Sequence, residues 1–321
     1  MGLKERKEAF DALAKRSPCQ RPSSLVCLYD LSEDALERLR AAVNLYMTRC
    51  LPVGRIPANE KELMQAFLEN WENIPNITPN GMIVPKRPTI LEYNIVVRTF
   101  AEIVDSFNIG DLILSWHVPL NVRFKTGEVN EGNLERHHPT EHIHSDSWAG
   151  ESAESVTVHI PLFGDTERNC MVFYDPPEHF QEDWLGPLPS YKAGADIASR
   201  YQKMDVKVKR GQAVLADFST LHSSSRFPGA KARVSIDTTF ALKKRKSSKK
   251  ETIHPWRVNE RASHDTLLGL GATHLFVFPD SMKQQVDSRG GFRHPSHLEI
   301  VNLLPAPSTR AVATGKAFGK K

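Results

Sequence analysis

Residues 155–174, SVTVHIPLFGDTERNCMVFY, contain two of the clearest strand patterns in the chain, separated by a turn. In the first half, valine, isoleucine and leucine alternate with other residues, which is the pattern of a half-buried strand; the second half is a short run rich in apolar and aromatic residues, which also favours a strand. Gly164-Asp165 lies between the halves and favours a change of chain direction. The stretch therefore predicts short strands at 155–163 and 169–174.

Similar patterns occur on both sides of this stretch, and they decide the fold class. They predict strands at 113–124, 140–148, 204–209, 212–218 and 233–242. Short strands without helical patterns between them are typical of an antiparallel sandwich or jelly roll, and they argue against a doubly wound parallel sheet. The connection 176–203 is long for a compact domain, which is typical of a lid or a binding loop.

The first 110 residues have mainly helical patterns. Apolar residues at helical spacing predict helices at about 33–50, from Asn59 to about Trp71, and at 90–107. The charged segment 1–16 is also expected to be helical. We therefore expect a helical support region at 1–110, a β-rich core at 111–300 that forms one domain with it, and a mobile tail at 301–321.

Composition places the chain among ordinary globular proteins. Its 321 residues are 40% hydrophobic and 25% charged. No apolar run approaches the roughly 18 residues of a membrane span, and the N-terminus lacks the apolar centre of a secretory signal. The four cysteines form no CxxC pair, so we expect reduced thiols and a cytoplasmic location.

The basic character of the chain comes from one local run, Lys243–Lys250. The net charge is +4, and without the six positive charges of this run it would be −2. Such a run is usually a solvated loop, although it also suits peripheral contact with an anionic membrane or contact with an acidic substrate. It has no interleaved aromatic residues, so it is weak evidence for a nucleic-acid partner.

A candidate metal motif lies just before the stretch quoted first. His144-Ser145-Asp146 places an imidazole and a carboxylate two residues apart, and His222 follows 76 residues later, at the end of the segment AVLADFSTLH. Two histidines and one carboxylate on one side of a metal leave three coordination positions open. This is the ligand set of non-haem Fe(II) oxygenases.

A candidate anion site follows the distal histidine. Arg233 lies eleven residues after His222, and Ser235 follows on the same face of its predicted strand. A guanidinium group can bind a carboxylate through two hydrogen bonds, and a serine hydroxyl adds a third donor. The order of these residues within a series of strands strengthens the metal hypothesis, because HxD alone is common.

The set His144-x-Asp146, His222 and Arg233-x-Ser235 resembles the Fe(II)/2-oxoglutarate-dependent dioxygenase superfamily over residues 113–242. The resemblance implies a mainly β, α+β fold: a double-stranded β-helix of the jelly-roll or cupin-like type, with helices packed against it. It implies that His144, Asp146 and His222 bind Fe(II). It also implies that Arg233 and Ser235 hold 2-oxoglutarate, which reacts with O2 to give succinate and CO2.

Within that family, the resemblance implies hydroxylation as the default reaction, with no catalytic residue beyond the metal ligands. The segment HSDSWAGE, residues 144–151, is also similar to bacterial sugar hydroxylases such as Kdo hydroxylases. We therefore expect a small or anionic substrate, and a carbohydrate-type molecule is one candidate.

Other polar and aromatic residues lie near the predicted site. His159 is a candidate to contact 2-oxoglutarate because it is expected to point into the barrel. Asn121 is a second candidate, since it shares a strand face with Arg123 and the two could meet 2-oxoglutarate or an anionic substrate. Arg123, Trp148 and His142 are candidates to contact the substrate. Packing in the core is the alternative for Trp148, and it is the favoured interpretation for Trp116.

Two alternatives to an oxygenase remain at this point. His138-Pro139-Thr140-Glu141-His142 matches the H-x-x-E-H motif of zinc peptidases, which requires a helix, although Pro139 lies inside it. A non-catalytic cupin-like binding protein would keep the fold without the reaction. The complete set of three ligands argues against this second alternative.

Overall fold

The computed structural model describes residues 2–52, 54, 56–78, 80–129, 134–243, 261–277 and 298–304. Its strands are β1 (Gln20–Ser23), β2 (Val26–Asp30), β3 (Met82–Ile83), β4 (Ile113–His117), β5 (Asn121–Lys125), β6 (Ser155–Gly164), β7 (Asn169–Asp175), β8 (Gln202–Lys203), β9 (Gln212–Asp217), β10 (Leu221–Arg226), β11 (Arg233–Leu242), β12 (Arg261–Ala262), β13 (His274–Val277) and β14 (Glu299–Asn302). The α-helices are α1 (Leu3–Ala14), α2 (Glu33–Cys50), α3 (Glu60–Asn70), α4 (Ile90–Asp105), α6 (Ala195–Ala198) and α7 (His264–Leu268).

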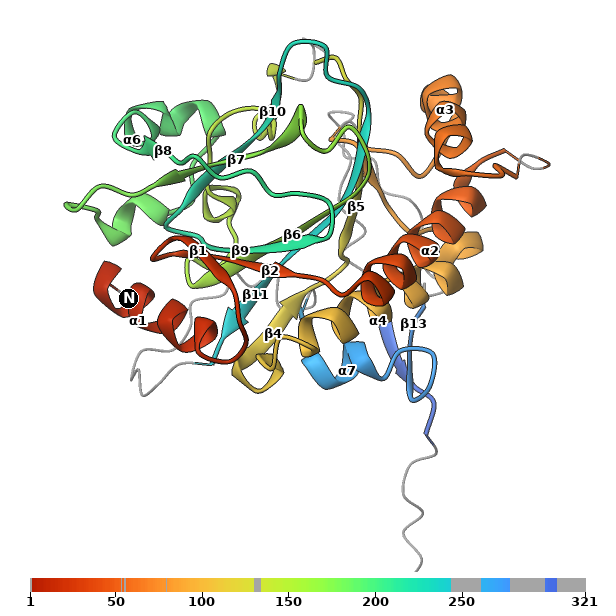
Figure 1. Ribbon diagram of the computed structural model, residues 1–321, viewed down its shortest axis with the longest axis horizontal. Helices are drawn as coiled ribbons and strands as arrows, with labels where there is room; N and C mark the ends of the chain where they lie inside the picture. The colour runs from red at the N-terminus through yellow and green to blue at the C-terminus, as the bar shows by residue number, and fades with distance from the viewer. Residues whose placement is uncertain are drawn as a thin grey trace, which may run out of the picture.

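Two antiparallel sheets form the centre of the molecule (Figure 1). The larger sheet has the order β1-β2-β9-β6-β11-β4-β12, and β5 pairs both β11 and β3. The smaller sheet has the order β10-β7-β8, while β13 and β14 form a separate pair. The architecture is therefore a mixed α/β one with a large antiparallel sheet, and it is consistent with a jelly roll.

The central strand β11 shows how the two faces of the larger sheet differ. Val234 and Ile236 are fully buried in the same hydrophobic cluster as residues of α2, α3 and α4. Arg233 and Asp237 alternate with them and line a cavity together with His222 of the smaller sheet. Because successive strand residues point to opposite faces, one face builds the core under the helices and the other builds the site.

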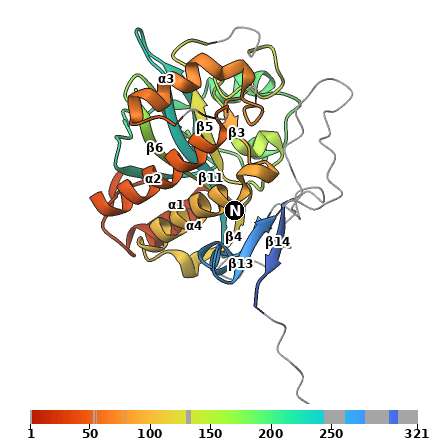
Figure 2. The same cartoon turned by 90° about the vertical axis from the view of Figure 1, so that its right-hand side faces the viewer.

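The three helices predicted between residues 33 and 107 are confirmed as α2, α3 and α4, which lie over the larger sheet (Figure 2). The helix starts follow from their caps. Ser32 accepts a hydrogen bond from the amide of Ala35, and Asn59 accepts one from the amide of Glu62. The carboxylate of Glu62 accepts hydrogen bonds from the amide of Ala58 and from the side chain of Asn59.

The first 110 residues were predicted to be mainly helical, but they also contain strands β1, β2 and β3. Strand β2 pairs with β9 over its whole length and extends the larger sheet. Its sequence, VCLYD, is nearly continuously apolar because both of its faces are covered. Such a run lacks the alternation that marks a half-buried strand.

Two of the predicted strands differ from the observed ones. Segment 113–124 is divided into β4 and β5 at Val118–Pro119, where proline cannot donate to a strand ladder. Segment 204–209 is not a strand: β8 ends at Lys203, and after it the amide of Met204 donates one further hydrogen bond to the carbonyl of Phe173.

The prediction around the metal motif was wrong in two details. His222 does not end the strand AVLADFSTLH, because β9 ends at Asp217 and His222 belongs to the next strand, β10. The side chain of Asp217 accepts hydrogen bonds from the amide and hydroxyl of Ser219, which forms a turn of the kind that short polar residues favour. Segment 140–148 is not a continuous strand: it pairs with β10 only around Thr140 and His144, and a 3-10 turn follows at Asp146–Ala149.

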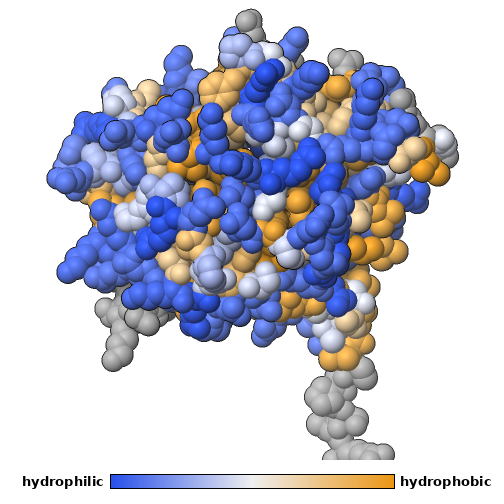
Figure 3. Space-filling model, viewed as in Figure 1, coloured by the Kyte–Doolittle hydropathy of each residue, from blue (hydrophilic) through white to orange (hydrophobic). Residues whose placement is uncertain are grey.

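The remaining predictions concern the surface and the C-terminal part. Residues 299–302 form β14, whereas 305–321 and Lys244–Lys250 lie outside the described residues. The face in Figure 3 is largely hydrophilic, as the composition suggests. Among the described helices, none has the length and apolar character needed to cross a bilayer. Cys19, Cys27, Cys50 and Cys170 are free thiols.

Candidate metal centre

The structure brings the three predicted ligands together at the cavity between the sheets. The backbones of His144 and His222 exchange two hydrogen bonds of 2.9 Å, so their rings lie 4.3 Å apart. Oδ1 of Asp146 is 3.6 Å from Nε2 of His144, and Oδ2 is 3.8 Å from Nε2 of His222. One potential ligand atom from each residue lies within 4.8 Å of the other two. Such a cluster can hold a metal ion from one side.

The orientation of His144 fits metal binding. Its Nδ1 is 2.7 Å from the carbonyl oxygen of His142, which only accepts hydrogen bonds, so Nδ1 carries the proton. The lone pair of Nε2 then points at the cluster. Nε2 is buried and has no hydrogen-bond partner among the described residues. A buried acceptor without a partner is costly unless a ligand completes it.

The charges of the site also suit a metal. Burial, together with the neighbouring His144, lowers the pKa of His222 to about 3, so its imidazole is neutral. Burial acts to raise the pKa of Asp146, but the imidazoles of His222 and His144 and the guanidinium of Arg123 hold it well below its usual range. A neutral imidazole on His222 and an ionised carboxylate on Asp146 are protonation states that coordination requires.

Tyr191 is a residue of the site that the sequence analysis missed. It lies in the long connection 176–203 and stacks on His144, with ring centroids 3.9 Å apart. Its amide donates to the carbonyl of His137 at 2.8 Å, which joins this connection to the ligand-bearing segment. The predicted role of 176–203 as a lid or binding loop stays a prediction, but one of its side chains covers a candidate ligand.

Arg233 is a buried cation on the wall of the same cavity, 1% exposed. Its Nη1 donates to Oγ of Ser235 at 3.1 Å and lies 3.3 Å from Nε2 of His159, and its Nε donates to Oδ1 of Asn169 at 3.2 Å. All three partners are uncharged, and no ion pair joins Arg233 to a carboxylate among the described residues. Burial lowers its pKa to about 10, so it remains a cation at neutral pH.

The contacts of Arg233 indicate which nitrogen of His159 carries the proton and what role Ser235 has. Because an arginine can only donate, Nε2 of His159 is the acceptor and its Nδ1 carries the proton. This Nδ1 is buried without a partner in the described chain, and His159 lines the cavity. Ser235 lies against Arg233 and outside the cavity lining, so it orients the guanidinium.

Asn169, the first residue of β7, was also missed by the sequence analysis. It is fully buried, and its amide nitrogen donates to the backbone carbonyls of Lys125, Thr126 and Lys231 at 3.1, 2.9 and 3.1 Å. These three bonds fix the amide, and its oxygen then holds Nε of Arg233. A single asparagine carries no sequence signal of such a role, because its partners are distant backbone atoms.

Asn121 and Arg123 are fixed by a shared carboxylate on β11. Asp237 accepts hydrogen bonds from Nδ2 of Asn121 at 2.8 Å and from Nε of Arg123 at 2.6 Å. Oδ1 of Asn121 and Nη1 of Arg123 are buried and have no partner among the described residues. Both residues line the cavity, so one acceptor and one donor remain available there.

The other two predicted substrate residues do not line the cavity. Trp148 is buried against the long connection, and its Nε1 donates to the carbonyl of Trp184 at 2.7 Å. His142 contributes its backbone carbonyl to His144. Trp116 lies in the main core, as the packing interpretation expected.

The alternative of a zinc peptidase does not fit the structure. Segment 138–142 is not helical, so the two histidines and Glu141 do not share the face that the motif requires. Glu141 is instead engaged by two cations: its Oε1 accepts from Nζ of Lys125 and from Nη1 of Arg226, each at 3.1 Å.

These contacts make Glu141 a source of acid sensitivity. Burial acts to raise the pKa of Glu141, but the two cations lower it from 4.5 to about 2. The carboxylate therefore stabilises the fold above pH 4.5, and this contribution is lost as the pH falls towards 2. Between pH 7 and 3 we expect the free energy of unfolding of the metal-free protein to fall by about 1–2 kcal/mol more than that of Glu141→Gln. Urea unfolding at the two pH values measures this difference, and equal losses in both proteins would contradict the assignment.

Comparisons with known proteins give matches to solved structures alone. No protein-family model matches the chain, and no curated protein matches it. Similar structures include the non-heme alpha ketoglutarate dependent epimerase SnoN from nogalamycin biosynthesis (14% identity, 74% of this chain and 83% of that chain, TM-score 0.35). AviO1 from Streptomyces viridochromogenes Tue57 is 15% identical, with 75% and 96% of the chains covered and a TM-score of 0.38.

A third similar structure is EctD from S. alaskensis with 2-oxoglutarate and 5-hydroxyectoine (14% identity, 80% of this chain and 83% of that chain, TM-score 0.36). The similar structures thus include enzymes of the superfamily that the sequence motif resembles. Identities of 14% and 15% and TM-scores of 0.35 to 0.38 are too low to assign an activity to this chain.

Proposed function

We propose that this protein is a non-haem Fe(II)- and 2-oxoglutarate-dependent oxygenase. One observation supports the proposal above the others: a buried arginine with only neutral partners shares a cavity with a cluster of two histidines and one aspartate. A buried charge without a counter-charge is costly, so Arg233 is expected to have an anionic ligand. A dicarboxylate that reaches both Arg233 and the metal satisfies both features.

The residues of the chain would divide the binding of the cosubstrate between them. His144, Asp146 and His222 would hold iron, while Arg233 binds the distal carboxylate of 2-oxoglutarate with Ser235 and Asn169 keeping its guanidinium in place. The proton on Nδ1 of His159 and the amide of Asn121 are further candidates to contact the cosubstrate. When bound, iron and 2-oxoglutarate supply the oxidation of a substrate C–H bond by O2, with release of succinate and CO2.

The cavity favours a small polar substrate. Its described lining residues all carry polar side-chain groups except Met171. An apolar substrate would leave Nη1 of Arg123 and Oδ1 of Asn121 buried and unpaired, at a cost of about 1–3 kcal/mol each. A substrate with hydroxyl or amide groups can pair with both atoms, and hydroxylation of a sugar-type molecule is our specific proposal.

The charges of the lining residues argue against a strongly anionic substrate. Two of them, Arg123 and Arg233, are cations, and three, Asp146, Asp237 and Glu151, are carboxylates. The charges of Fe(II) and of doubly ionised 2-oxoglutarate would cancel. The described lining residues therefore keep a slight excess of negative charge. Of the two predicted substrate types, the small polar one is therefore favoured. The free thiols agree with a cytoplasmic location, which stays a prediction.

The direct test is an anaerobic titration of the metal-free protein with Fe(II), followed by 2-oxoglutarate. We expect the visible charge-transfer absorption of a 2-oxo acid chelated to iron, and succinate after O2 is admitted. Pyruvate is the matched control: it has the same chelating group but lacks the distal carboxylate that Arg233 would bind. We expect pyruvate to give no band at the concentration at which 2-oxoglutarate saturates. Failure of the protein to bind iron, or equal binding of the two acids, would contradict the proposal.

A further inference from the structure

The segment that carries His144 and Asp146 is not held by regular secondary structure. Between residues 135 and 143 the chain forms neither a helix nor a strand, although it leads directly into the candidate ligands. Its backbone pairs with β10 at only two places, through the carbonyl of Thr140 to the amide of Ser224 at 2.7 Å and through His144 to His222. Side-chain contacts must therefore contribute to its position.

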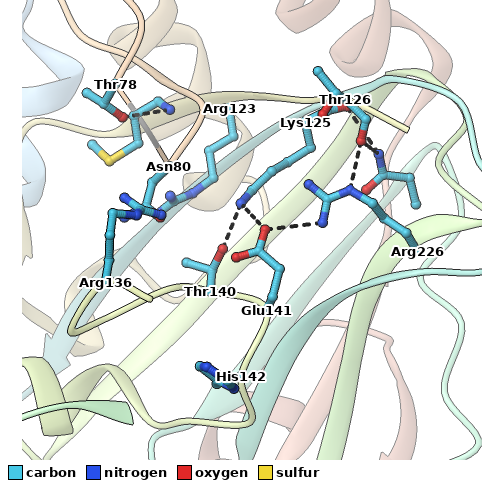
Figure 4. Close-up of polar contacts among 12 residues, drawn as sticks. Thr78, Asn80, Arg123, Lys125, Thr126, Arg136, Thr140, Glu141, His142 and Arg226 are labelled. Atoms are coloured by element: carbon cyan, nitrogen blue, oxygen red, sulfur yellow. Dashed lines mark hydrogen bonds and ion pairs between the residues drawn. The ribbon is translucent and has the colours of Figure 1, made fainter. Parts of the chain in front are cut away.

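Glu141 contributes contacts with two buried cations. Figure 4 shows the side chains of Lys125 and Arg226 converging on its carboxylate. Lys125 also donates to Oγ1 of Thr140 at 2.7 Å. Lys125 ends β5 of the larger sheet, and Arg226 ends β10 of the smaller sheet. One carboxylate therefore joins both sheets to the ligand-bearing segment, three residues before His144.

The strands joined in this way carry the other parts of the site. Strand β10 contributes His222, and β5 contributes Asn121 and Arg123. Arg226 also donates through Nε to the carbonyl of Thr126 at 2.8 Å. Asn169 donates to the same carbonyl and holds Arg233, so the cluster around Glu141 is continuous with the anion site.

Burial restricts the positions that the charged groups of this cluster can take relative to one another. The side chains of Lys125, Glu141 and Arg226 are only 4%, 11% and 8% exposed. Burial lowers the pKa of Lys125 to about 7, while Glu141 acts to keep the ammonium charged. Buried charges require their partners at defined positions, because an unpaired charge in the interior is strongly unfavourable. The cluster is therefore suited to fix a segment that has no ladder of its own.

We infer that Glu141 is a positioning residue for the metal centre: through Lys125 and Arg226 it sets the distance between the His144–Asp146 segment and His222. The inference rests on the proposed function and adds a role for a residue outside the ligand set. Loss of the carboxylate lets the segment shift relative to β10. His144 and Asp146 then meet His222 at less favourable distances, and the metal binds more weakly.

The test measures binding of Co(II) alone, without cosubstrate or turnover. Cobalt is stable in air, and its visible absorption reports both affinity and ligand geometry. We expect Glu141→Gln to weaken Co(II) binding at least about tenfold, in line with other residues that orient metal ligands, and to change the shape of the absorption band. Lys125→Met should weaken binding in the same direction, and it keeps the test decisive if Glu141→Gln does not fold.

A matched control separates positioning from general stability. Glu102 on α4 likewise accepts from two basic side chains, Arg38 at 3.0 Å and Arg98 at 2.9 Å, but it lies in the helical layer. Glu102→Gln should leave Co(II) affinity unchanged. The affinity of folded protein is measured under native conditions, so a residue with a purely structural role would lower the urea midpoint without changing this affinity.

The outcomes distinguish the inference from the proposed function. If wild-type protein binds Co(II) and the folded Glu141 and Lys125 variants bind it within twofold of wild type, the positioning role is wrong and the metal site stands. If wild-type protein does not bind Co(II), the proposed function fails, and the inference fails with it. Weaker binding in both variants, with wild-type binding in Glu102→Gln, supports the inference.

Discussion

Replacement of Asp146 by alanine is expected to abolish metal binding while leaving the fold intact. Asp146 is the only candidate ligand with a negative charge, and its carboxylate lies within 4 Å of both histidines. Without it, only the imidazoles of His144 and His222 remain, and two imidazoles hold a divalent ion far more weakly than the complete set. We expect the affinity for Fe(II) to fall by about a thousandfold or more, and 2-oxoglutarate-dependent O2 consumption to disappear with it.

The measurement is an anaerobic titration with Fe(II), and circular dichroism monitors the fold. Glu151→Gln is the matched control, because Glu151 is a second carboxylate on the wall of the same cavity. It accepts a hydrogen bond from the hydroxyl of Thr239 at 2.6 Å and lies 3.1 Å from Nδ1 of His117, and it is not part of the candidate ligand set. We expect this control to bind iron as the wild type does. Tight iron binding by folded Asp146→Ala would remove Asp146 from the ligand set.

The sequence allowed the ligand set to be predicted because its chemistry is local and its order is restrictive. His144 and Asp146 are two residues apart, and the Arg233-x-Ser235 pair follows His222 on a strand with a clear alternating pattern. The regular strands β6, β7 and β11 were predictable for the same reason. A strand with one apolar face has a periodicity that a single sequence displays.

The supporting residues could not be predicted, because their roles depend on contacts between distant segments. Tyr191 reaches His144 from a long connection, and Asn169 holds Arg233 through three backbone carbonyls. The sequence around Glu141 matched a peptidase motif by residue type, but its partners Lys125 and Arg226 lie on two different strands. Strand β2 was not predicted because it is buried on both faces, so its sequence lacks the alternation of apolar and polar residues.

Arg233→Met should separate cosubstrate binding from both metal binding and stability. The bound dicarboxylate would receive two or more charge-assisted hydrogen bonds from Arg233, each worth about 1.5–3 kcal/mol. Their loss corresponds to a decrease in 2-oxoglutarate affinity of about a hundredfold or more. Fe(II) should still bind, because none of the ligands His144, Asp146 and His222 contacts Arg233 among the described interactions.

The same substitution should not destabilise the protein without ligand. Arg233 is a buried cation whose hydrogen-bond partners Ser235, His159 and Asn169 are all neutral, and burial lowers its pKa to about 10. An apolar side chain of similar length removes a buried charge that has no carboxylate of the described residues within ion-pair distance, and such a replacement is often neutral or stabilising. We therefore expect the urea midpoint of metal-free Arg233→Met to equal or exceed that of the wild type.

Arg233→Lys tests whether geometry or charge determines cosubstrate binding. Lysine keeps the positive charge but lacks the planar fork that binds a carboxylate through two hydrogen bonds. Affinity for 2-oxoglutarate, measured from the charge-transfer absorption, should therefore lie between those of wild type and Arg233→Met.

Saturation of Arg233→Met at the concentration of 2-oxoglutarate that saturates the wild type would show that the distal carboxylate binds elsewhere. A large loss of stability in Arg233→Met would instead mean that the guanidinium holds β7 and β11 together, since Asn169 on β7 is its partner. The neutral partners of Arg233 favour the first of these two roles, binding of an external anion, because a cation that served only to join strands would be expected to have a carboxylate of the chain beside it.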